Sequence, residues 1–424
     1  MQTADVVGLI VILLLIALCV TFITAYIQLP YTLALVIVGL IIGESHLFPT
    51  VVLSPDLVLF IFLPGLLFEG AWNLDSKYLL GDWLPVTLFV ILGLLFSIAV
   101  IAITLHYMES FDWLTATLLG AIVSPTDPVS VVGLLRRMHM DKRLLTLLEG
   151  ESLFNDGTAA VAYAVILAFV AGASVIPGFN LSSPAGALAN SVLGFLLLAG
   201  GGLGVGVLVG LIASLLLPLV TDHLIETTVT AVMAYGVYLL ADVLHTSGIL
   251  AVVAATLVLG NYGRQRGITP RAQEVIDALW EFIAFVANSL LFLLVGFEIR
   301  VVSVSHVLVP IGWTVLALVV SRGVSMILLV PTSDGLVARR YGRPIGWRWL
   351  RPIPIRWRTI LILGGLRGAL SLALVLSLPT NLPYRDQLIG IVYGVVLVTL
   401  LGQGIGLRVL LPHLHKQGTD TSSD

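Results

Sequence analysis

The chain has 424 residues, of which 58% are hydrophobic and only 11% are charged. Its mean hydropathy of +1.07, with repeated apolar runs near the roughly 20 residues that cross a bilayer, excludes an ordinary soluble domain. A formal net charge of −3 argues against a nucleic-acid partner, because a phosphate-binding surface needs a concentrated excess of Lys and Arg. The single cysteine, Cys19, excludes an intrachain disulfide. The composition therefore predicts an all-α polytopic membrane protein.

Hydropathy predicts about thirteen transmembrane spans. The first six lie at about 5–27, 30–44, 55–72, 83–107, 113–135 and 146–173, the seventh at about 186–217, and the last six at about 224–242, 247–262, 275–298, 306–331, 357–378 and 386–411. An odd number of spans places the two termini on opposite sides of the membrane.

Lys and Arg gather in alternate loops of this topology, as the positive-inside rule requires of correctly placed spans. With the N-terminus outside, the inner loops hold most of the 21 Lys and Arg residues, and the outer loops hold only Arg300 and Arg385. We therefore predict a cell-membrane protein with a cytoplasmic C-terminus. The inner charges either only set this orientation or bind particular lipids. Segment 332–358, rich in Arg and Trp, is expected along the lipid headgroups, and 412–424 is expected to be a short disordered tail.

A few ionisable residues fall inside the predicted spans. A charge at mid-bilayer costs at least about 2.5–3.5 kcal/mol, so each is a functional candidate that needs a partner. These candidates are Glu69, Asp127, Glu151, Asp156, Arg322 and Arg367. Glu69, in FLPGLLFEGAW of the third span, is expected either to neighbour a cation path or to reach interfacial water.

The fifth span is interrupted by SPTDP at residues 124–128. Pro125 and Pro128 each remove a backbone donor, so the helix should break near mid-membrane. Thr126 and Asp127 can cap the half-helix that follows. Irregular backbone at this depth is tolerated only where protein or water surrounds it, which predicts a cavity beside the break. The alternative is a kinked helix in which the polar side chains satisfy their own backbone.

The sixth span begins with GESLFNDG at residues 150–157. Ser152 and Asp156 are four residues apart and share one helix face, and Glu151 and Asn155 share the adjoining face. A carboxylate with hydroxyl and carbonyl oxygens nearby suits a small hard cation, and the same carboxylate can take a proton instead. The alternative for Asp156 is a buried structural hydrogen bond. Glu151 is expected to form a salt bridge with an intramembrane arginine.

The twelfth span reads GGLRGALSL at residues 364–372, with glycines on both sides of Arg367. Counted on either side of the seventh span, the fifth and twelfth spans are each fifth in their half. Paired interruptions of this kind indicate inverted repeats with a binding site at the membrane midplane.

Four motifs, in this order on these spans, resemble the monovalent cation/proton antiporter family: FLPGLLFEGA, the mid-span TDP, GESLFNDG and GGLRGALSLAL. The similarity is to the branch of NhaP-type antiporters and sodium/proton exchangers. It implies thirteen helices in two inverted six-helix repeats with discontinuous crossing helices, and a homodimer. It also implies a single transporter domain over 1–411, in which spans 1–3 and 8–10 form a dimerisation scaffold, spans 4–6 and 11–13 an ion-transporting core, and span 7 a linker.

The resemblance also assigns residues. Asp156 resembles the aspartate that binds the cation or the proton, and Asn155 its partner in an Asn-Asp pair. Thr126 and Ser152 resemble further ligands of Na⁺, and Asp127 the residue that balances the broken helix ends. Glu151 with Arg367, or with Arg322, resembles a structural ion pair. One titrating carboxylate implies electroneutral exchange, and no cofactor is implied.

Three other functions remain open from the sequence. K⁺/H⁺ exchange would use the same residues, because cation preference depends on the dimensions of the site. An intramembrane aspartyl protease would use Asp127 and Asp156 as paired acids, although such enzymes carry GxGD and YD patterns that differ from TDP and NDG. A passive channel would need no proton coupling. The sequence favours a Na⁺(Li⁺)/H⁺ antiporter, not an enzyme.

Overall fold

The computed structural model describes residues 3–27, 31–45, 54–138, 140–177, 183–299, 306–341, 353–365 and 367–419. These ranges contain helices and loops and no strand, in agreement with the predicted all-α class. In the first half, the long elements are α1 (Thr3–Ile27), α2 (Tyr31–Ser45), η1 with α3 (Leu57–Trp72), α5, η2 and α6 (Trp83–Glu109), α7 (Trp113–Val123), α8 (Val129–Arg137), α9 (Lys142–Val170) and α10 (Pro184–Leu216). The second half contains α11 (His223–Val243), α12 (Gly248–Val258), α14 (Pro270–Glu298), α16 (Leu308–Tyr341), α17 (Ile355–Leu363), α18 (Ala369–Leu376) and α19 (Arg385–Thr419).

Short polar residues begin many of these helices. The side chain of each accepts a hydrogen bond from a backbone N–H in the first helical turn, which satisfies a donor that has no partner within the helix. Asp112, Ser183, Asp222, Ser247 and Thr269 cap α7, α10, α11, α12 and α14 in this way. The apolar runs between these caps then fix the helix lengths.

Each of the thirteen predicted spans coincides with one helix or with consecutive helices of the structure. Seven described helical segments are long and apolar enough to cross a membrane by themselves, and shorter apolar helices lie between them. The number of crossings stays a prediction. At its end, α19 continues past residue 411 to Thr419, into the segment expected to be a disordered tail. Much of the segment expected along the headgroups, 342–352, lies outside the described residues.

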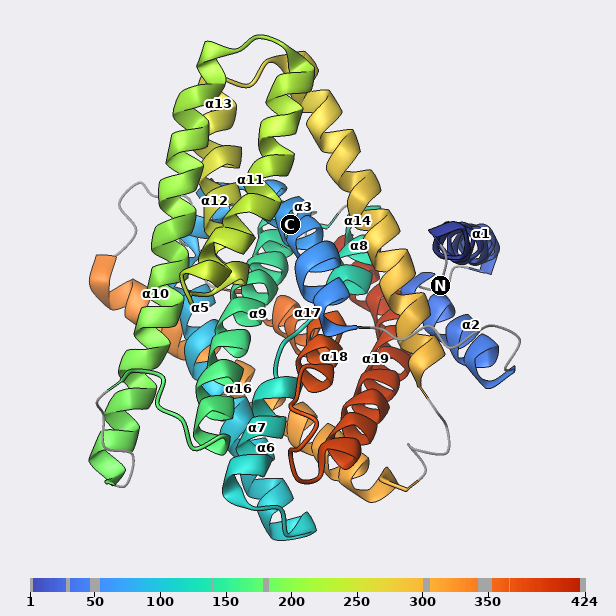
Figure 1. The fold of residues 1–424 in the computed structure, drawn as a ribbon, viewed down its shortest axis with the longest axis vertical. Coiled ribbons are helices and arrows are strands. Elements are labelled where there is room, and N and C mark those ends of the chain that lie inside the picture. The colour runs from blue at the N-terminus through green and yellow to red at the C-terminus, as the bar shows by residue number, and fades with distance from the viewer. Residues whose placement is uncertain are drawn as a thin grey trace.

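Glycines allow the close packing of α10 on α12 and of α2 on α14. A Cβ on Gly206 of α10 would lie 2.3 Å from the Ala251 carbonyl oxygen of α12, and one on Gly39 of α2 would lie 2.2 Å from the Leu293 carbonyl oxygen of α14. The breaks between α7 and α8 and between α17 and α18 lie in the middle of the molecule, and α9 and α19 flank α17 and α18 (Figure 1). These long helices therefore hold the breaks away from the surface.

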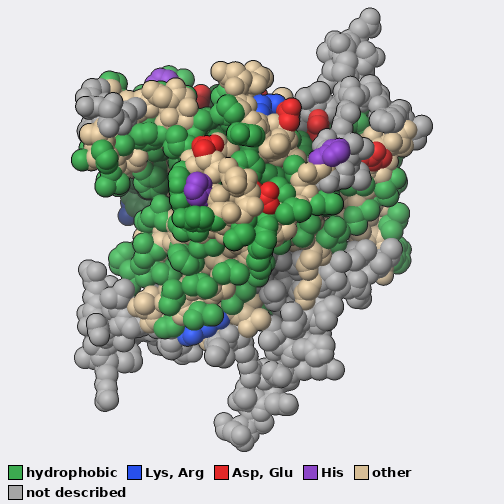
Figure 2. Space-filling model, turned by 90° about the horizontal axis from the view of Figure 1, so that it is seen from below, with side chains coloured by type: hydrophobic (Ala, Val, Ile, Leu, Met, Phe, Trp, Pro, Cys, Tyr) green, Lys and Arg blue, Asp and Glu red, His purple; other side chains and the backbone are tan. Residues whose placement is uncertain are grey.

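The two ends of the molecule differ in their connections. The α6–α7 and α18–α19 turns lie at the lower end of Figure 1, and the α10–α11 turn lies at the upper end. Seen from the lower end, the described surface is largely hydrophobic and shows few Lys or Arg side chains (Figure 2). This is the end that the loop charges assign to the outside.

Candidate functional site

The predicted break of the fifth span separates α7, which ends at Val123, from α8, which begins at Val129. Thr126 lies in the non-helical segment between them and is 4% exposed. The Asp127 carboxylate accepts a hydrogen bond of 3.1 Å from the Val129 N–H, a donor that the start of α8 leaves without an intrahelical partner. Asp127 therefore caps the second half-helix.

The second break lies directly against the first. A Cβ on Gly368, the residue before α18, would lie 2.1 Å from Asp127 Oδ2. Only glycine permits this approach, so the Asp127 carboxylate lies beside the N-terminal ends of both α8 and α18. Helix N-termini carry partial positive charge, and one carboxylate balances two of them here.

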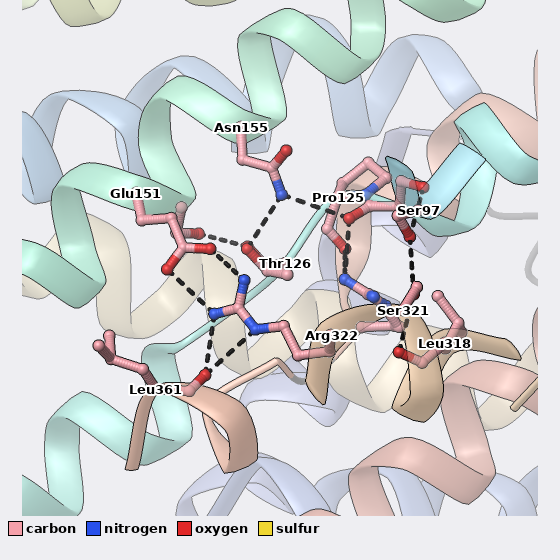
Figure 3. Close-up of polar contacts among 12 residues, drawn as sticks. Ser97, Pro125, Thr126, Glu151, Asn155, Leu318, Ser321, Arg322 and Leu361 are labelled. Carbon is pink, nitrogen blue, oxygen red and sulfur yellow. Dashed lines mark hydrogen bonds and ion pairs between the residues drawn. The ribbon is translucent and has the colours of Figure 1, made fainter. Parts of the chain in front are cut away.

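Two arginines bind the opposite, carbonyl ends of the broken helices. Arg367 donates from one terminal nitrogen to the Ser124 oxygen at 2.8 Å and to the Pro125 oxygen at 3.0 Å, just after α7. Arg322 of α16 donates to the Leu361 oxygen of α17 at 2.9 and 3.2 Å (Figure 3). Cations at helix C-termini are stabilised by the helix dipole, so each arginine compensates one carbonyl end.

Arg322 also forms the buried ion pair of the site. Its two terminal nitrogens contact the two carboxylate oxygens of Glu151, one of them at 3.0 Å (Figure 3). Glu151 is 2% exposed and the Arg322 side chain is 13% exposed, so the carboxylate is buried and the guanidinium is largely so. Of the two arginines considered from the sequence, Arg322 is the one that pairs with Glu151, and Arg367 binds backbone carbonyls instead.

The polar residues of α9 hold the first break in place. Ser152 donates its hydroxyl proton to the Thr126 carbonyl oxygen. The Asn155 amide donates to the Thr126 hydroxyl at 3.2 Å and to the Ser124 oxygen at 3.3 Å. Glu151 and Asn155 line a second, smaller cavity with Arg322 and Arg367. The GESLFNDG segment of α9 therefore presents two distinct faces, as the sequence predicts.

Ser152 and Asp156 face a larger cavity of about 480 Å³. Its polar lining near the breaks comes from Thr126, Asp127, Ser152 and Asp156, and Glu69 lies in the same lining. Within the described part of the chain, no residue donates a hydrogen bond to the Asp156 carboxylate. The Asp156 oxygens are thus available to a ligand in the cavity.

The cavity extends from Asp156 in only one direction along α9. From α9 it takes Glu149, Ser152, Leu153 and Asp156, and no residue after Asp156. The next residue, Gly157, is closed off by α12, because a Cβ on it would lie 2.4 Å from the Leu250 side chain. The cavity therefore leads from Asp156 toward the N-terminal end of α9 alone.

Some lining residues were not foreseen from the sequence. Arg136 of α8 and Glu149 of α9 form an ion pair of 2.6 Å, and Glu281 and Asn288 of α14 line the same cavity. The sequence does contain a signal for Asn288, because an amide interrupts the apolar run of the tenth span. Glu149 and Glu281 lie near the N-terminal ends of the sixth and tenth predicted spans.

The donor set fits a monovalent cation. Among the described residues, no three His, Cys, Asp or Glu side chains come together as a metal centre. Asp156, Thr126 and Ser152 offer one full negative charge with neutral hydroxyl and carbonyl oxygens, which are ligands that hard cations prefer. Broken helices that meet beside an intramembrane carboxylate are typical of secondary transporters with inverted repeats.

Comparison with known proteins identifies the family. The family described as "Sodium/hydrogen exchanger, transmembrane" matches residues 10–413, and the chain belongs to it. The chain is 40% identical over 387 residues to the Na(+)/H(+) antiporter ApNhaP of Aphanothece halophytica, which covers 91% of this chain and 70% of that protein. It is 31% identical over 420 residues to the Na(+)/H(+) antiporter NhaH of Halobacillus dabanensis, with 96% and 97% coverage.

A solved structure has the same fold. The sodium proton antiporter MjNhaP1 from Methanocaldococcus jannaschii, at pH 8, superposes with a TM-score of 0.70 and 20% sequence identity, over 95% of this chain and 100% of that one. At this identity the likeness shows the fold alone.

Proposed function

We propose that this protein is an electroneutral antiporter that exchanges one Na⁺ or Li⁺ for one proton at Asp156. The observation that carries the proposal is the position of Asp156, a carboxylate that accepts no hydrogen bond from any described residue and lies at the closed end of a cavity beside two crossing helix breaks. The names of the relatives and the family membership support Na⁺/H⁺ exchange. An ionised Asp156 carries one negative charge, which either one cation or one proton can neutralise.

Each neighbouring group has a role in this exchange. The Thr126 and Ser152 oxygens replace part of the water shell of the cation as it reaches Asp156. Asp127 accepts a hydrogen bond from the Val129 N–H and lies beside two positive helix ends, so we assign it to those helix ends rather than to proton exchange. Only Asp156 then changes its proton, which makes the cycle electroneutral. Asn155 holds the Thr126 hydroxyl in place through its amide.

The cycle requires the closed side of Asp156 to open in turn. We assign spans 4–6 and 11–13 to a moving core and spans 1–3 and 8–10 to a scaffold that dimerises with a second copy in the cell membrane. The one-sided cavity supports alternating access, because Asp156 faces only one end of the molecule. The loop charges assign that end to the cytoplasm, with the N-terminus outside.

Proton flux in proteoliposomes tests the proposal. Wild-type protein should release protons on addition of Na⁺ or Li⁺, and clamping the membrane potential at zero should leave the rate unchanged. Asp156→Asn should abolish the flux, and Ser289→Ala, a change in α14 away from the cavity, should retain it. Because protons and cations compete for one carboxylate, the half-saturating Na⁺ concentration should rise as pH falls. Sodium-driven proton flux at the wild-type rate in Asp156→Asn would contradict the proposal.

The same assay compares cations. K⁺ is the second candidate substrate, because the ligand types at Asp156 are also suitable for K⁺. Flux with K⁺ equal to or above flux with Na⁺ would assign the protein to K⁺/H⁺ exchange.

A further inference from the structure

One polar side chain in the cavity has no part in the site described above. Asn288 belongs to α14, and its neighbours there, Ala287 and Ser289 to Val295, are buried. Asn288 is 8% exposed and lines the same cavity as Asp156, from the scaffold rather than from the core. It is therefore a buried amide on the wall that faces the proposed cation site.

The lining residues of α14 occupy one helix face. Glu281, Ala284, Phe285 and Asn288 follow the three- and four-residue spacing of a single helical stripe. Seven residues along an α-helix correspond to about 10 Å, so Asn288 lies about two turns from Glu281 along the cavity wall. This face of α14 therefore presents the Glu281 carboxylate to the cavity and, about two turns further along the helix, the neutral Asn288 amide.

The Asn288 amide has no hydrogen-bond partner in the described part of the chain. Its amide atoms are not among the buried polar atoms that lack a partner, so they reach the cavity. The scaffold hydroxyls of the lining differ in this respect, because Thr21 donates to the Ala17 oxygen at 2.8 Å and Thr24 to the Thr21 oxygen at 3.0 Å. An amide kept free at the cavity surface indicates a polar ligand.

We propose that Asn288 is a scaffold-side ligand of the transported cation, engaged only while the cavity is open as it is here. This inference rests on the proposed exchange at Asp156. An amide oxygen is a good ligand for hard cations, and a neutral one adds no second charge to balance. Thr126, Ser152 and Asp156 move with the core, whereas Asn288 stays with α14. The cation therefore exchanges the Asn288 oxygen for other ligands during each cycle.

The test is the sidedness of cation affinity. Asn288→Ala should raise the half-saturating Na⁺ concentration about fivefold, the factor expected for one lost neutral contact, when Na⁺ is supplied at the cavity side. In membrane vesicles of the opposite orientation the value should stay that of the wild type. Ser289→Ala is the matched control, because Ser289 is fully buried beside Asn288 and does not line the cavity. Asn288→Asp, which keeps an oxygen in place, should restore an affinity at least as high as that of the wild type.

Each result decides one question. An unchanged cavity-side affinity in Asn288→Ala, or an equal change from both sides, would overturn the assignment of Asn288. A loss of affinity in Asn288→Asp equal to that in Asn288→Ala would overturn it as well. Asp keeps a side-chain oxygen at this position, so the loss could not then come from a missing oxygen ligand. If wild-type protein itself showed no Na⁺-driven proton flux, the proposed exchange would fail instead, and the two failures are thereby distinguishable.

Discussion

The ion pair between Glu151 and Arg322 joins three helices through two charged side chains inside the predicted spans. Both side chains line a small cavity separate from that of the proposed cation site, and Arg322 divides its donors between the Glu151 carboxylate and the Leu361 carbonyl. Removing one partner of a buried pair leaves the other charge without compensation, which costs about 3–5 kcal/mol. The pair therefore stabilises a junction of α9, α16 and α17 rather than binding substrate.

We predict that Glu151→Gln and Arg322→Gln each lower the free energy of unfolding by about 3–5 kcal/mol, and that the double variant loses less than the sum. Thermal unfolding in detergent measures the three effects. Asp386→Asn is the control, since the Asp386 side chain of the Arg385–Asp386 pair is 99% exposed and such surface pairs contribute only about 0–1 kcal/mol. Fully additive losses in the double variant would show that Glu151 and Arg322 act separately.

The residues of the site were partly accessible from sequence. The helical period alone separates Ser152 and Asp156 from Glu151 and Asn155, because it depends only on local spacing. The partner of Glu151 is different, since Arg322 and Arg367 both lie far along the chain and only the packing of α16 and the second break decides between them. Asn288 was missed for the same reason, because its importance comes from the cavity that it faces.

At the scale of elements, hydropathy placed the helices well. Apolar length is a strong local signal, and the two breaks were visible as SPTDP and as the glycines around Arg367. The ends of helices were less predictable. The helix α19 continues to Thr419, past the residues from which a tail was predicted. The division of the chain into scaffold and core depends on relative movement, which no local pattern encodes.

The close contact between α10 and α12 gives a prediction for elements. Gly202, Gly206 and Gly210 lie along one face of α10, and a Cβ on any of them would meet the α12 backbone or its preceding Ser247 at 2.3–2.6 Å. On the same helix, Gly204 faces open space. We expect Gly206→Ala to separate the two helices and to destabilise the protein by about 1–3 kcal/mol, the usual effect of overpacking.

The control for this change is Gly204→Ala, which should be neutral or slightly stabilising because alanine has the higher helix propensity. Thermal unfolding of both variants in lipid nanodiscs compares their unfolding temperatures for the same Gly→Ala change on the same helix. Equal unfolding temperatures for Gly206→Ala and Gly204→Ala would show that the α10–α12 contact is loose in the membrane.

At the scale of the whole molecule, the position of Asp156 between an open and a closed side is the central feature. Leu153 lines the cavity and packs on Gly70 of α3, where a Cβ would lie 3.2 Å from it. On the other side of Asp156, Leu250 of α12 packs into the notch at Gly157. A large side chain thus fits against a glycine on each side of the carboxylate. In the proposed alternating access, α9 would move along α3 and α12 at these two contacts.

This arrangement predicts the access of a thiol reagent. The chain has one cysteine, so Cys19→Ser gives a background free of thiols. In that background, Gly133→Cys places a thiol in the cavity, where no atom lies within 4 Å of the added Cβ. Ala159→Cys places a thiol on the same face of α9 as Asp156 but about one turn beyond it, at a residue that is 0% exposed. A membrane-impermeant reagent should modify Gly133→Cys from the cavity side only. Ala159→Cys should resist from that side and become reactive from the opposite side when a cation gradient drives turnover. Modification of Ala159→Cys from the cavity side would mean that Asp156 does not separate two compartments, and alternating access at this residue would be wrong.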